Sequence, residues 1–352
     1  MKARQGLDPA LLQAAIPKLL EHHDALRMRF SRRDGEWRQF NSVEERHEVF
    51  VVEDLSAVAD ESLSQAMELA AEHWQATLDL FEGPLMRTVL FELGPHRPQR
   101  LLMVIHHLVM DGVSWRILIE DLHTLYHQLA AGEAVSLPPK TTSYRQWSQR
   151  LCRYAGTQRA AETYWNELAS APAPSFPVEN PEGANTESCT GEIILSLGKQ
   201  HTQALLQQVP PVYRTRNDDG LLAALAQVIC CWSRNDSVLI NLEGHGREDL
   251  FPELDLSRTV GWFTSLFPVL LAVKAETGPG ALLQSVKEQL RAVPDHGIGY
   301  GLQRYLSGPN PVSLSAPISF NYLGRLDQAL PQESLFEPAD ESAGACFGAE
   351  NT

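Results

Sequence analysis

The strongest constraint on the fold is residues 101–122, LLMVIHHLVMDGVSWRILIEDL, where an apolar run ends in a polar turn and a second apolar pattern follows. Residues 101–105 predict a buried strand, and apolar residues at helical spacing over 115–122 predict a helix. A strand that passes through a turn into a helix delivers side chains to one edge of a sheet, where α/β folds tend to place their chemistry. The turn therefore predicts an α/β fold with a candidate site, and it carries His106, His107, Asp111 and Gly112.

The length of the chain and one break in its patterning predict two lobes. A chain of 352 residues suits two compact lobes of roughly 150 to 200 residues each better than it suits one small core. In residues 171–191, APAPSFPVENPEGANTESCTG, proline, glycine and small polar residues replace any periodic pattern, which is typical of a linker. We therefore expect an N-terminal lobe over 1–172, a linker over 173–191 and a C-terminal lobe over 192–352.

Charge and cysteine usage exclude several classes of protein. A formal net charge of -15 argues against nucleic acid and membrane as partners, and an acidic partner would have to meet a locally basic face. The start of the chain lacks the apolar core of a secretory signal, and no apolar stretch is long enough to span a bilayer. The five cysteines lack metal-ligand spacing and predict buried free thiols in a reducing, cytoplasmic compartment: Cys152, Cys189, Cys230, Cys231 and Cys346.

Periodicity predicts the main helices and strands. Asp8 as N-cap and Pro9 at the first helical position begin a helix that reaches the His22–His23 pair, and such helix-surface histidines are more often caps or packing residues than site residues. The first lobe should also contain strands over 48–52 and 86–91, a helix over 62–75, a helix ending near Gly132 and an aromatic, arginine-bearing region over 144–165. The second lobe should contain strands over 192–197 and 238–242 and a buried helix over 220–232.

In the first polar turn, His107 is the candidate for acid–base chemistry. An unperturbed imidazole has a pKa of about 6.5, close to operating pH, which suits a general base. The alternative is a core histidine bonded to backbone. Asp111 is expected to be structural, because a carboxylate at the start of a helix stabilises the turn by bonding backbone amides or a nearby arginine.

A second polar turn, EGHGRE, follows the strand over 238–242. Glu243 stands at the strand end beside flexible glycine backbone. If this carboxylate is partly buried, its pKa rises and it can exchange protons near neutral pH. The alternative is that Glu243 forms an ion pair with Arg247 or Arg258.

Other kinds of site match the sequence poorly. His106 and His107 are adjacent, so on an extended strand they would point to opposite faces and could not bind one metal ion together. The chain has no G-x-S-x-G nucleophile elbow, no dinucleotide fingerprint and no P-loop. The glycines of residues 258–271, 294–301 and 319–325 predict tight turns or close backbone approach near a cavity.

An ordered set of motifs resembles one protein family. HHLVMDGVSW is similar to the HHxxxDG signature of the nonribosomal peptide synthetase condensation superfamily, and the Val-Ser-Trp-Arg of this stretch resembles its epimerization branch. EGHGRE, SRTVGWFTSLFP, PDHGIGYG and FNYLGR then follow in the order of that branch. The early helix ending in EHHDALRMRF is also typical of the superfamily, so the resemblance covers essentially the whole chain.

The resemblance implies an α/β fold of two lobes, each like chloramphenicol acetyltransferase, in a V-shaped pseudo-dimer with a tunnel between them. It implies that the phosphopantetheine arm of a peptidyl carrier protein brings an aminoacyl or peptidyl thioester into the tunnel. There the α-carbon would be inverted from L toward D, with no diffusible cofactor and no metal. Other synthetase domains are expected partners.

The chemistry of inversion suggests roles for individual residues. Removal of an α-proton beside a thioester gives an enolate-like intermediate, which must be reprotonated from the opposite face. His107 and Glu243 are predicted to flank the substrate across the lobe interface and to share the proton transfers, with the choice of face left open. By resemblance, Asn321 and Tyr322 line the same site and stabilise the enolate oxygen. The residues expected to be structural at the site are His106, Asp111, Gly112 and Arg247.

The chain also departs from the family pattern. The family begins with a strand before the first helix and continues past FNYLG, so the chain is expected to be truncated at both ends, and near Asn217 a polar residue stands where the family has an apolar one. Two alternatives follow: a condensation domain that joins two carrier-bound substrates, and a non-catalytic or decayed fragment. EGHGRE and RTVGWFT favour epimerization over condensation.

Overall fold

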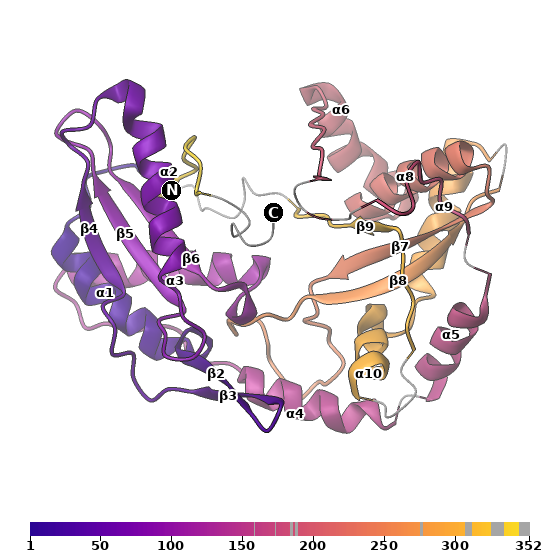
Figure 1. Cartoon of the computed structure of the whole chain (residues 1–352), viewed down its shortest axis with the longest axis horizontal. Helices are drawn as coiled ribbons and strands as arrows, with labels where there is room; N and C mark the ends of the chain where they lie inside the picture. The colour runs from indigo at the N-terminus through magenta and orange to yellow at the C-terminus, as the bar shows by residue number, and fades with distance from the viewer. Residues whose placement is uncertain are drawn as a thin grey trace. The chain divides into compact units, whose positions relative to one another are not determined.

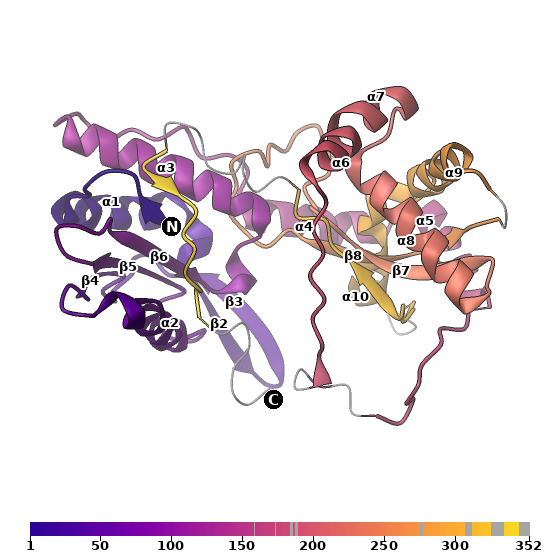
Figure 2. The ribbon, with the colours of Figure 1, turned by 90° about the horizontal axis from the view of Figure 1, so that it is seen from above.

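The structure is a computed structural model that describes residues 1–157, 159–172, 174–183, 186, 189–274, 277–306, 312–324 and 334–344. Contacts between residues divide the chain into two compact units, whose elements are labelled in Figures 1 and 2. Unit 1 comprises Met1–Trp147, Phe251–Phe263 and Leu323–Gly348, and unit 2 comprises Ser148–Leu250, Thr264–Tyr322 and Ala349–Thr352.

The two units are not continuous along the sequence. The predicted division passes once from 1–172 through the linker 173–191 to 192–352, whereas Phe251–Phe263 belongs to unit 1 although the segments on either side of it belong to unit 2. The boundary after Trp147 falls inside helix α4 (Tyr144–Ala155). The predicted lobe boundaries therefore stay a prediction, because the units defined by residue contacts are not the same as the predicted lobes.

Unit 1 is built on a five-stranded sheet in the order β10-β1-β6-β5-β4. Strands β4 and β5 are parallel, while β5 and β6 are antiparallel with Met86 opposite Ile105. A separate hairpin pairs β2 with β3. The bounds are β1 Lys2–Ala3, β2 Met28–Arg33, β3 Glu36–Asn41, β4 Phe50–Asp54, β5 Met86–Glu92, β6 Arg100–Ile105 and β10 Phe336–Glu337. Strand β1 precedes the first helix and pairs with β10 and β6, so a short strand is present before that helix.

Helices cover both faces of this sheet. Figure 2 shows α1 (Pro9–His22) and α3 (Gly112–Ala130) on one face and α2 (Asp60–Ala76) on the other. Strand β5 serves both cores, because successive side chains of a strand point to opposite faces. Its Met86 and Leu90 pack with α1 and α3, whereas Val89 and Phe91 pack with α2.

The predicted helix start at Asp8 is confirmed. Its carboxylate accepts a hydrogen bond of 2.8 Å from the backbone N–H of Ala10, and Pro9 occupies the first helical position. The buried residues of α1 recur at helical spacing and face α3: Leu12, Ala15, Ile16, Leu19 and Leu20. Burial of this stripe is the main stabilising contribution to the helix.

Unit 2 is built on a three-stranded sheet in the order β8-β7-β9, with β7 antiparallel to β8 and parallel to β9. Side chains of α8 and α9 pack on it around Ala226, Val286 and Ile240, each fully buried. The bounds are β7 Ser237–Gly244, β8 Ser265–Ala272, β9 Ile318–Phe320, α5 Arg159–Ser170, α6 Lys199–Gln203, the π-helical turn η4 Ala204–Gln208, α7 Val209–Tyr213, α8 Asn217–Ser233, α9 Pro279–Arg291, the 3-10 turn η5 Pro294–Gly297 and α10 Ile298–Leu306.

Several sequence expectations need correction. The strand expected over 192–197 does not form, and its side chains are exposed, with Leu195 at 90%. A run of apolar residues predicts a strand only if another strand pairs with it, and among the described residues none does. The region 144–165 divides into α4 and α5. Helix α8 is buried on one side only, because Trp232 is 57% exposed.

The thiols are less buried than expected. Cys230 lies in the core of unit 2, but its helical neighbour Cys231 is exposed, and Cys152 and Cys189 are exposed as well. Cys346 lies outside the described residues. Within the described chain, no helix combines the length and apolar character that crossing a bilayer requires.

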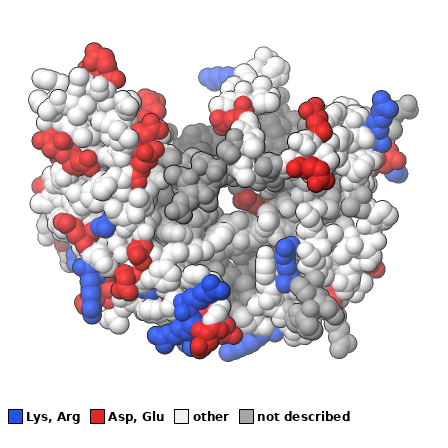
Figure 3. Space-filling view, in the orientation of Figure 1, with Lys and Arg blue, Asp and Glu red and all other residues white. Residues whose placement is uncertain are grey.

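Basic side chains gather on one part of unit 1. In the view of Figure 3 they lie over the β2–β3 hairpin, whose exposed arginines are Arg32, Arg33 and Arg38. No ion pair involving these three arginines occurs among the described residues. The hairpin also carries the exposed Asp34 and Glu36, so its surface is only weakly basic.

The core of unit 1 gives a first prediction. Leu118 on α3 is fully buried, so Leu118→Ala should lower the free energy of unfolding by about 3 kcal/mol through lost apolar burial and a residual cavity. Leu69→Ala on α2 is the matched control, because Leu69 is 59% exposed and should change stability by less than about 0.5 kcal/mol. Urea unfolding followed by circular dichroism measures both. Equal shifts of the two midpoints would contradict the described core.

Candidate functional site

The first candidate turn lies where β6 ends, in unit 1. The backbone N–H of His106 donates to the carbonyl of Leu85 at 2.9 Å, and His106 Nδ1 accepts from the N–H of Leu108 at 3.2 Å. A short 3-10 turn, η2 (His107–Val109), follows. Burial lowers the pKa of the His106 imidazole from its ordinary value of 6.5, and the neighbouring His107 lowers it further. His106 therefore stabilises the turn as a neutral acceptor.

His107 projects outward from this turn and is exposed. Its ring packs against Trp262, with ring centroids 5.4 Å apart and an angle of 65° between the planes. The indole holds one side of the imidazole, while the exposed side stays accessible. The alternative of a core histidine is therefore wrong, and the imidazole is accessible at the surface of unit 1.

Asp111 begins α3 and is almost completely buried. Its Oδ1 accepts hydrogen bonds of 2.8 Å from both the N–H and the hydroxyl of Ser114, and its Oδ2 accepts from the N–H of Phe263 at 3.2 Å. The expectation that Asp111 bonds backbone amides is confirmed. One of these amides belongs to a residue 152 positions away in the sequence, so Asp111 also joins two distant segments.

The segment Phe251–Phe263, here called the 251–263 segment, carries Trp262 to His107. Gly261 N–H donates to the Ser114 hydroxyl at 3.2 Å, and Tyr144 OH donates to the carbonyl of Trp262 at 3.0 Å. Burial and then Asp111 raise the pKa of Tyr144, which keeps its hydroxyl protonated as a donor. A side chain at Gly261 would meet the Tyr144 ring at 2.7 Å, so this glycine permits a close approach.

The second candidate turn lies in unit 2, at the ends of β7 and β9. These strands run parallel, with Leu242 opposite Phe320, so the residues that follow the pair reach the same edge of the sheet. There the side-chain amide of Asn321 donates to Glu243 Oε2 at 2.7 Å. Alternation along β7 turns Leu242 into the core and Glu243 to the opposite, exposed face.

The residues after Glu243 form a tight turn. A side chain at Gly244 would meet Ser265 Oγ at 2.8 Å, which explains glycine at this position. His245 Nδ1 accepts a hydrogen bond of 3.0 Å from the backbone N–H of Arg247, and His245 Nε2 lies 3.6 Å from Glu248. The turn is thus braced by its own side chains and leaves Glu243 at its beginning.

A second tight turn packs beside it. Asp295, His296 and Gly297 have φ angles of 48°, 51° and 88°, three consecutive residues in the left-handed region. A side chain at Gly297 would overlap the Phe267 ring, and the carbonyl of His296 would lie 3.9 Å from a side chain at Gly244. The expected close backbone approach is confirmed for this turn, and two non-glycine residues in this conformation cost about 1 kcal/mol or more each.

The structure changes the expected partners of Glu243. This carboxylate is exposed rather than partly buried, and it bonds Asn321. Arg258, one of the two expected ion-pair partners, instead contacts Glu120 and Asp121 on α3. Tyr322 follows Asn321 and is partly buried, and its predicted role stays a prediction. His107, Asp111 and Gly112 belong to unit 1, whereas Glu243, Arg247, Asn321 and Tyr322 belong to unit 2.

Comparison with known proteins identifies the family. The condensation domain family matches residues 1–345, so the chain belongs to that family. A linear gramicidin synthase polypeptide from Brevibacillus parabrevis is 44% identical over 353 residues, which cover 98% of this chain. The chain spans 7% of the length of this curated relative. Chondramide synthase from Chondromyces crocatus is 41% identical over 99% of this chain, which spans 9% of its length.

Two solved structures show the extent of the structural similarity. The epimerization domain from the third module of tyrocidine synthetase B is 33% identical with a TM-score of 0.88, over 99% of this chain and 79% of that one. The first condensation domain of the calcium-dependent antibiotic synthetase, in complex with a substrate analogue, is 20% identical with a TM-score of 0.68, over 91% and 72%. The predicted mixed α/β fold of this superfamily is therefore confirmed.

Sequence reasoning missed the surroundings of His107. Trp262, Arg258 and Tyr144 are all visible in the sequence, and SRTVGWFT stands out as a motif. No pattern, however, assigns that motif to His107, because the two are separated by about 150 residues and by elements of unit 2. Paired substitutions in related sequences would have been the signal for this contact.

Asp111 gives a second prediction. In Asp111→Asn one oxygen becomes an amide nitrogen that faces an N–H donor, so the free energy of unfolding should fall by about 1 to 3 kcal/mol. Asp8→Asn is the matched control, because Asn caps a helix as well as Asp and Asp8 is exposed. Thermal unfolding measures both variants. A control that falls as far as Asp111→Asn would reject the bridging role.

His106 gives a third prediction, on pH. Because its folded-state pKa lies below 6.5, the unfolded chain binds more protons between the two pKa values. The contribution of His106 to the free energy of unfolding is therefore fully present well above pH 6.5, and it is lost as the pH drops from 6.5 toward the folded-state pKa. His22, whose pKa burial also lowers, contributes with the same sign. Unfolding free energies measured across this range should depend less on pH in His106→Gln, and an unchanged slope would contradict the assignment.

Proposed function

We propose that this chain inverts the α-carbon of an aminoacyl or peptidyl thioester, from L toward D, in nonribosomal peptide synthesis. The substrate would be carried on the phosphopantetheine arm of a peptidyl carrier protein, next to other domains of a cytoplasmic synthetase. The observation that carries the proposal is the likeness to the tyrocidine epimerization domain, at 33% identity and a TM-score of 0.88. The lower TM-score of 0.68 to a condensation domain supports the same choice.

The chemistry needs two proton-transfer groups. Breaking the α-C–H bond leaves its electron pair in an enolate, with the charge on the thioester oxygen, and a proton added to the opposite face completes the inversion. In our proposal, the Glu243 carboxylate and the His107 imidazole act on the two faces of the same carbon. The proton taken by one group is balanced by the proton that the other releases, so no cofactor is consumed.

Neighbouring side chains would tune these two groups. The amide of Asn321, 2.7 Å from Glu243 Oε2, fixes the orientation of the carboxylate. Trp262 restricts the ring of His107. In the proposal, Tyr322 donates to the enolate oxygen, where a hydrogen bond is worth more than in the ground state because charge develops there.

The test separates proton exchange from inversion. A carrier protein loaded with the L- or the D-aminoacyl thioester is incubated in D₂O, and the released amino acid is analysed for deuterium by mass spectrometry and for configuration by chiral chromatography. Glu243→Gln and His107→Gln should each reduce inversion by about 10²-fold or more, because each removes one proton-transfer group. Asn321→Ala should reduce it by about 10-fold, since one orienting hydrogen bond is lost.

The pattern of remaining exchange identifies the face that each group serves. The variant that lacks the group facing the L-proton should lose deuterium uptake from the L-thioester and retain it from the D-thioester, and the other variant should do the reverse. Asp249→Asn is the control, an exposed carboxylate close to the same turn. Unchanged inversion in Glu243→Gln would reject the role of Glu243. Peptide-bond formation with a second loaded carrier, without exchange, would instead indicate a condensation domain.

A further inference from the structure

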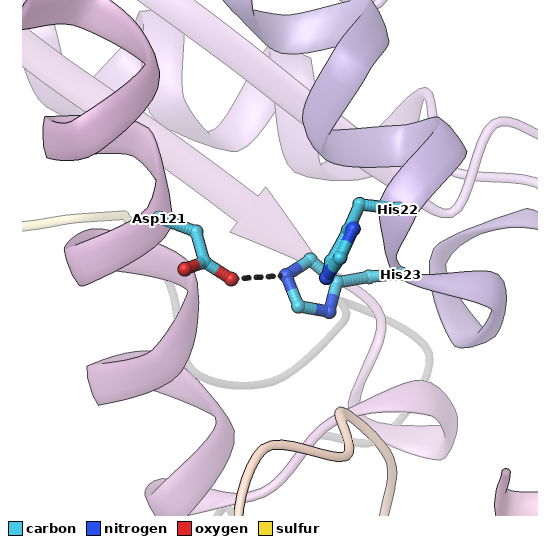
Figure 4. Close-up of side chains that lie close together, drawn as sticks. All are labelled: His22, His23 and Asp121. Carbon is cyan, nitrogen blue, oxygen red and sulfur yellow. Dashed lines mark hydrogen bonds and ion pairs between the residues drawn. The ribbon is translucent and has the colours of Figure 1, made fainter. Parts of the chain in front are cut away.

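A network of polar side chains in unit 1 joins the end of α1, helix α3 and the 251–263 segment. His23 Nε2 and Asp121 Oδ2 are 2.8 Å apart, and the other carboxylate oxygen, Oδ1, accepts from the guanidinium of Arg258. Figure 4 shows His23 at the end of α1 directed toward Asp121 on α3, with His22 beside it. The side chains of His23 and Asp121 are 4% and 2% exposed, so this pair is almost completely shielded from solvent.

The cluster is not arranged as a metal site. The ligand atoms of His22, His23 and Asp121 lie within 4.8 Å of one another, as an ion would require. Both oxygens of Asp121 are already hydrogen-bonded, one to His23 and one to a permanently charged arginine. A cation would have to displace Arg258 or share its partner. The geometry instead describes a carboxylate that holds an arginine.

Arg258 connects this cluster to the 251–263 segment. Its guanidinium also donates to Glu120 at 3.1 Å, so two neighbouring carboxylates of α3 hold one fork of donors. Four residues later, Trp262 contacts the His107 ring. Between them, Thr259 Oγ1 donates to the carbonyl of Thr142 at 2.6 Å. Arg258 is thus an ionic anchor of the short peptide that ends beside His107.

We propose that Arg258, held by Asp121 and His23, is a positioning residue for His107. A buried carboxylate without its arginine would carry an uncompensated charge, so the anchor is strong and directional. Lysine supplies the charge but not the planar fork, so it cannot hold Glu120 and Asp121 in the same way. Loss of the fork releases the segment before Trp262, and displacement of the indole removes the support on one side of the imidazole.

Arg258→Lys, compared with a matched control, tests this inference. The control is Arg97→Lys, because Arg97 has a similar side-chain exposure, 22% against 27%, and its guanidinium binds the Asp60 carboxylate and backbone carbonyls away from the 251–263 segment. Trp262→Ala provides the reference for an unsupported His107 ring. All variants are first compared by thermal unfolding with the unsubstituted chain.

The main readout needs no substrate. Histidine labelled with ¹³C gives a ring signal for His107, assigned from its loss in His107→Gln, and the nearby indole shifts this signal through its ring current. Arg258→Lys should move the signal toward its position in Trp262→Ala, and Arg97→Lys should leave it in place. If Arg258→Lys is too unstable, Glu120→Gln, which removes the negative charge of one of the two carboxylates at a partly exposed position, should give a smaller shift in the same direction.

The second readout rests on the proposed function. In the inversion assay Arg258→Lys should lower kcat by about 10-fold to 100-fold with little change in KM, because the substrate still binds while the imidazole is misplaced. If the unsubstituted chain shows no exchange, the proposed function fails, but the His107 signal still tests the anchor. An unmoved His107 signal in Arg258→Lys, or an equal shift in Arg97→Lys, would overturn the positioning role.

Discussion

The site in unit 1 depends on a buried carboxylate that accepts hydrogen bonds from two directions. Asp111 satisfies the start of α3 through Ser114 and, through Phe263, a segment from far along the chain. Burying an ionised carboxylate is costly unless donors surround it, and here the donors are supplied by the elements that must meet. The hydrogen bonds of Asp111 therefore determine which segments pack together, α3 and the 251–263 segment, and they also stabilise that packing.

The two candidate groups reach the protein surface by different means. Glu243 is placed by sheet geometry, because parallel β7 and β9 end at one edge and bring Asn321 beside the carboxylate. His107 is placed by a turn and needs support from a separate segment to hold its ring. The end of a paired strand is held rigidly by its neighbours, whereas a turn is more mobile. Several hydrogen bonds accordingly hold the segment that carries Trp262, whereas among the described residues Glu243 has one side-chain hydrogen bond, to Asn321.

Local patterns predicted much of this architecture. The strand over 101–105, the helix that follows it and the capping role of Asp111 were readable because each depends on neighbours in sequence. The prediction of a strand over 192–197 was wrong, because a segment forms a strand only where a second strand is available to pair with it. The ion pair considered between Arg258 and Glu243 is absent for the same reason. By charge alone Glu243 and Asp121 are equally suitable partners, and only tertiary packing decides for Asp121.

The motifs identified the family, while the contacts between motifs came only from the structure. EGHGRE and FNYLG were found as separate stretches, and their meeting at Glu243 and Asn321 follows from a parallel strand pair that no spacing rule predicts. Likewise, no spacing rule places SRTVGWFT next to the HHLVMDG turn, where Trp262 contacts His107.

The placement of the 251–263 segment in unit 1 limits how the polypeptide can be divided. A cut in the proline-rich stretch near residue 180 would give a front fragment lacking Trp262 and a rear fragment carrying it. Neither piece alone would contain a complete His107 turn. The two fragments would have to associate so that the 251–263 segment of the rear fragment packs on the front fragment. A split at this position therefore suits a fragment-complementation design and does not give two independently folding pieces.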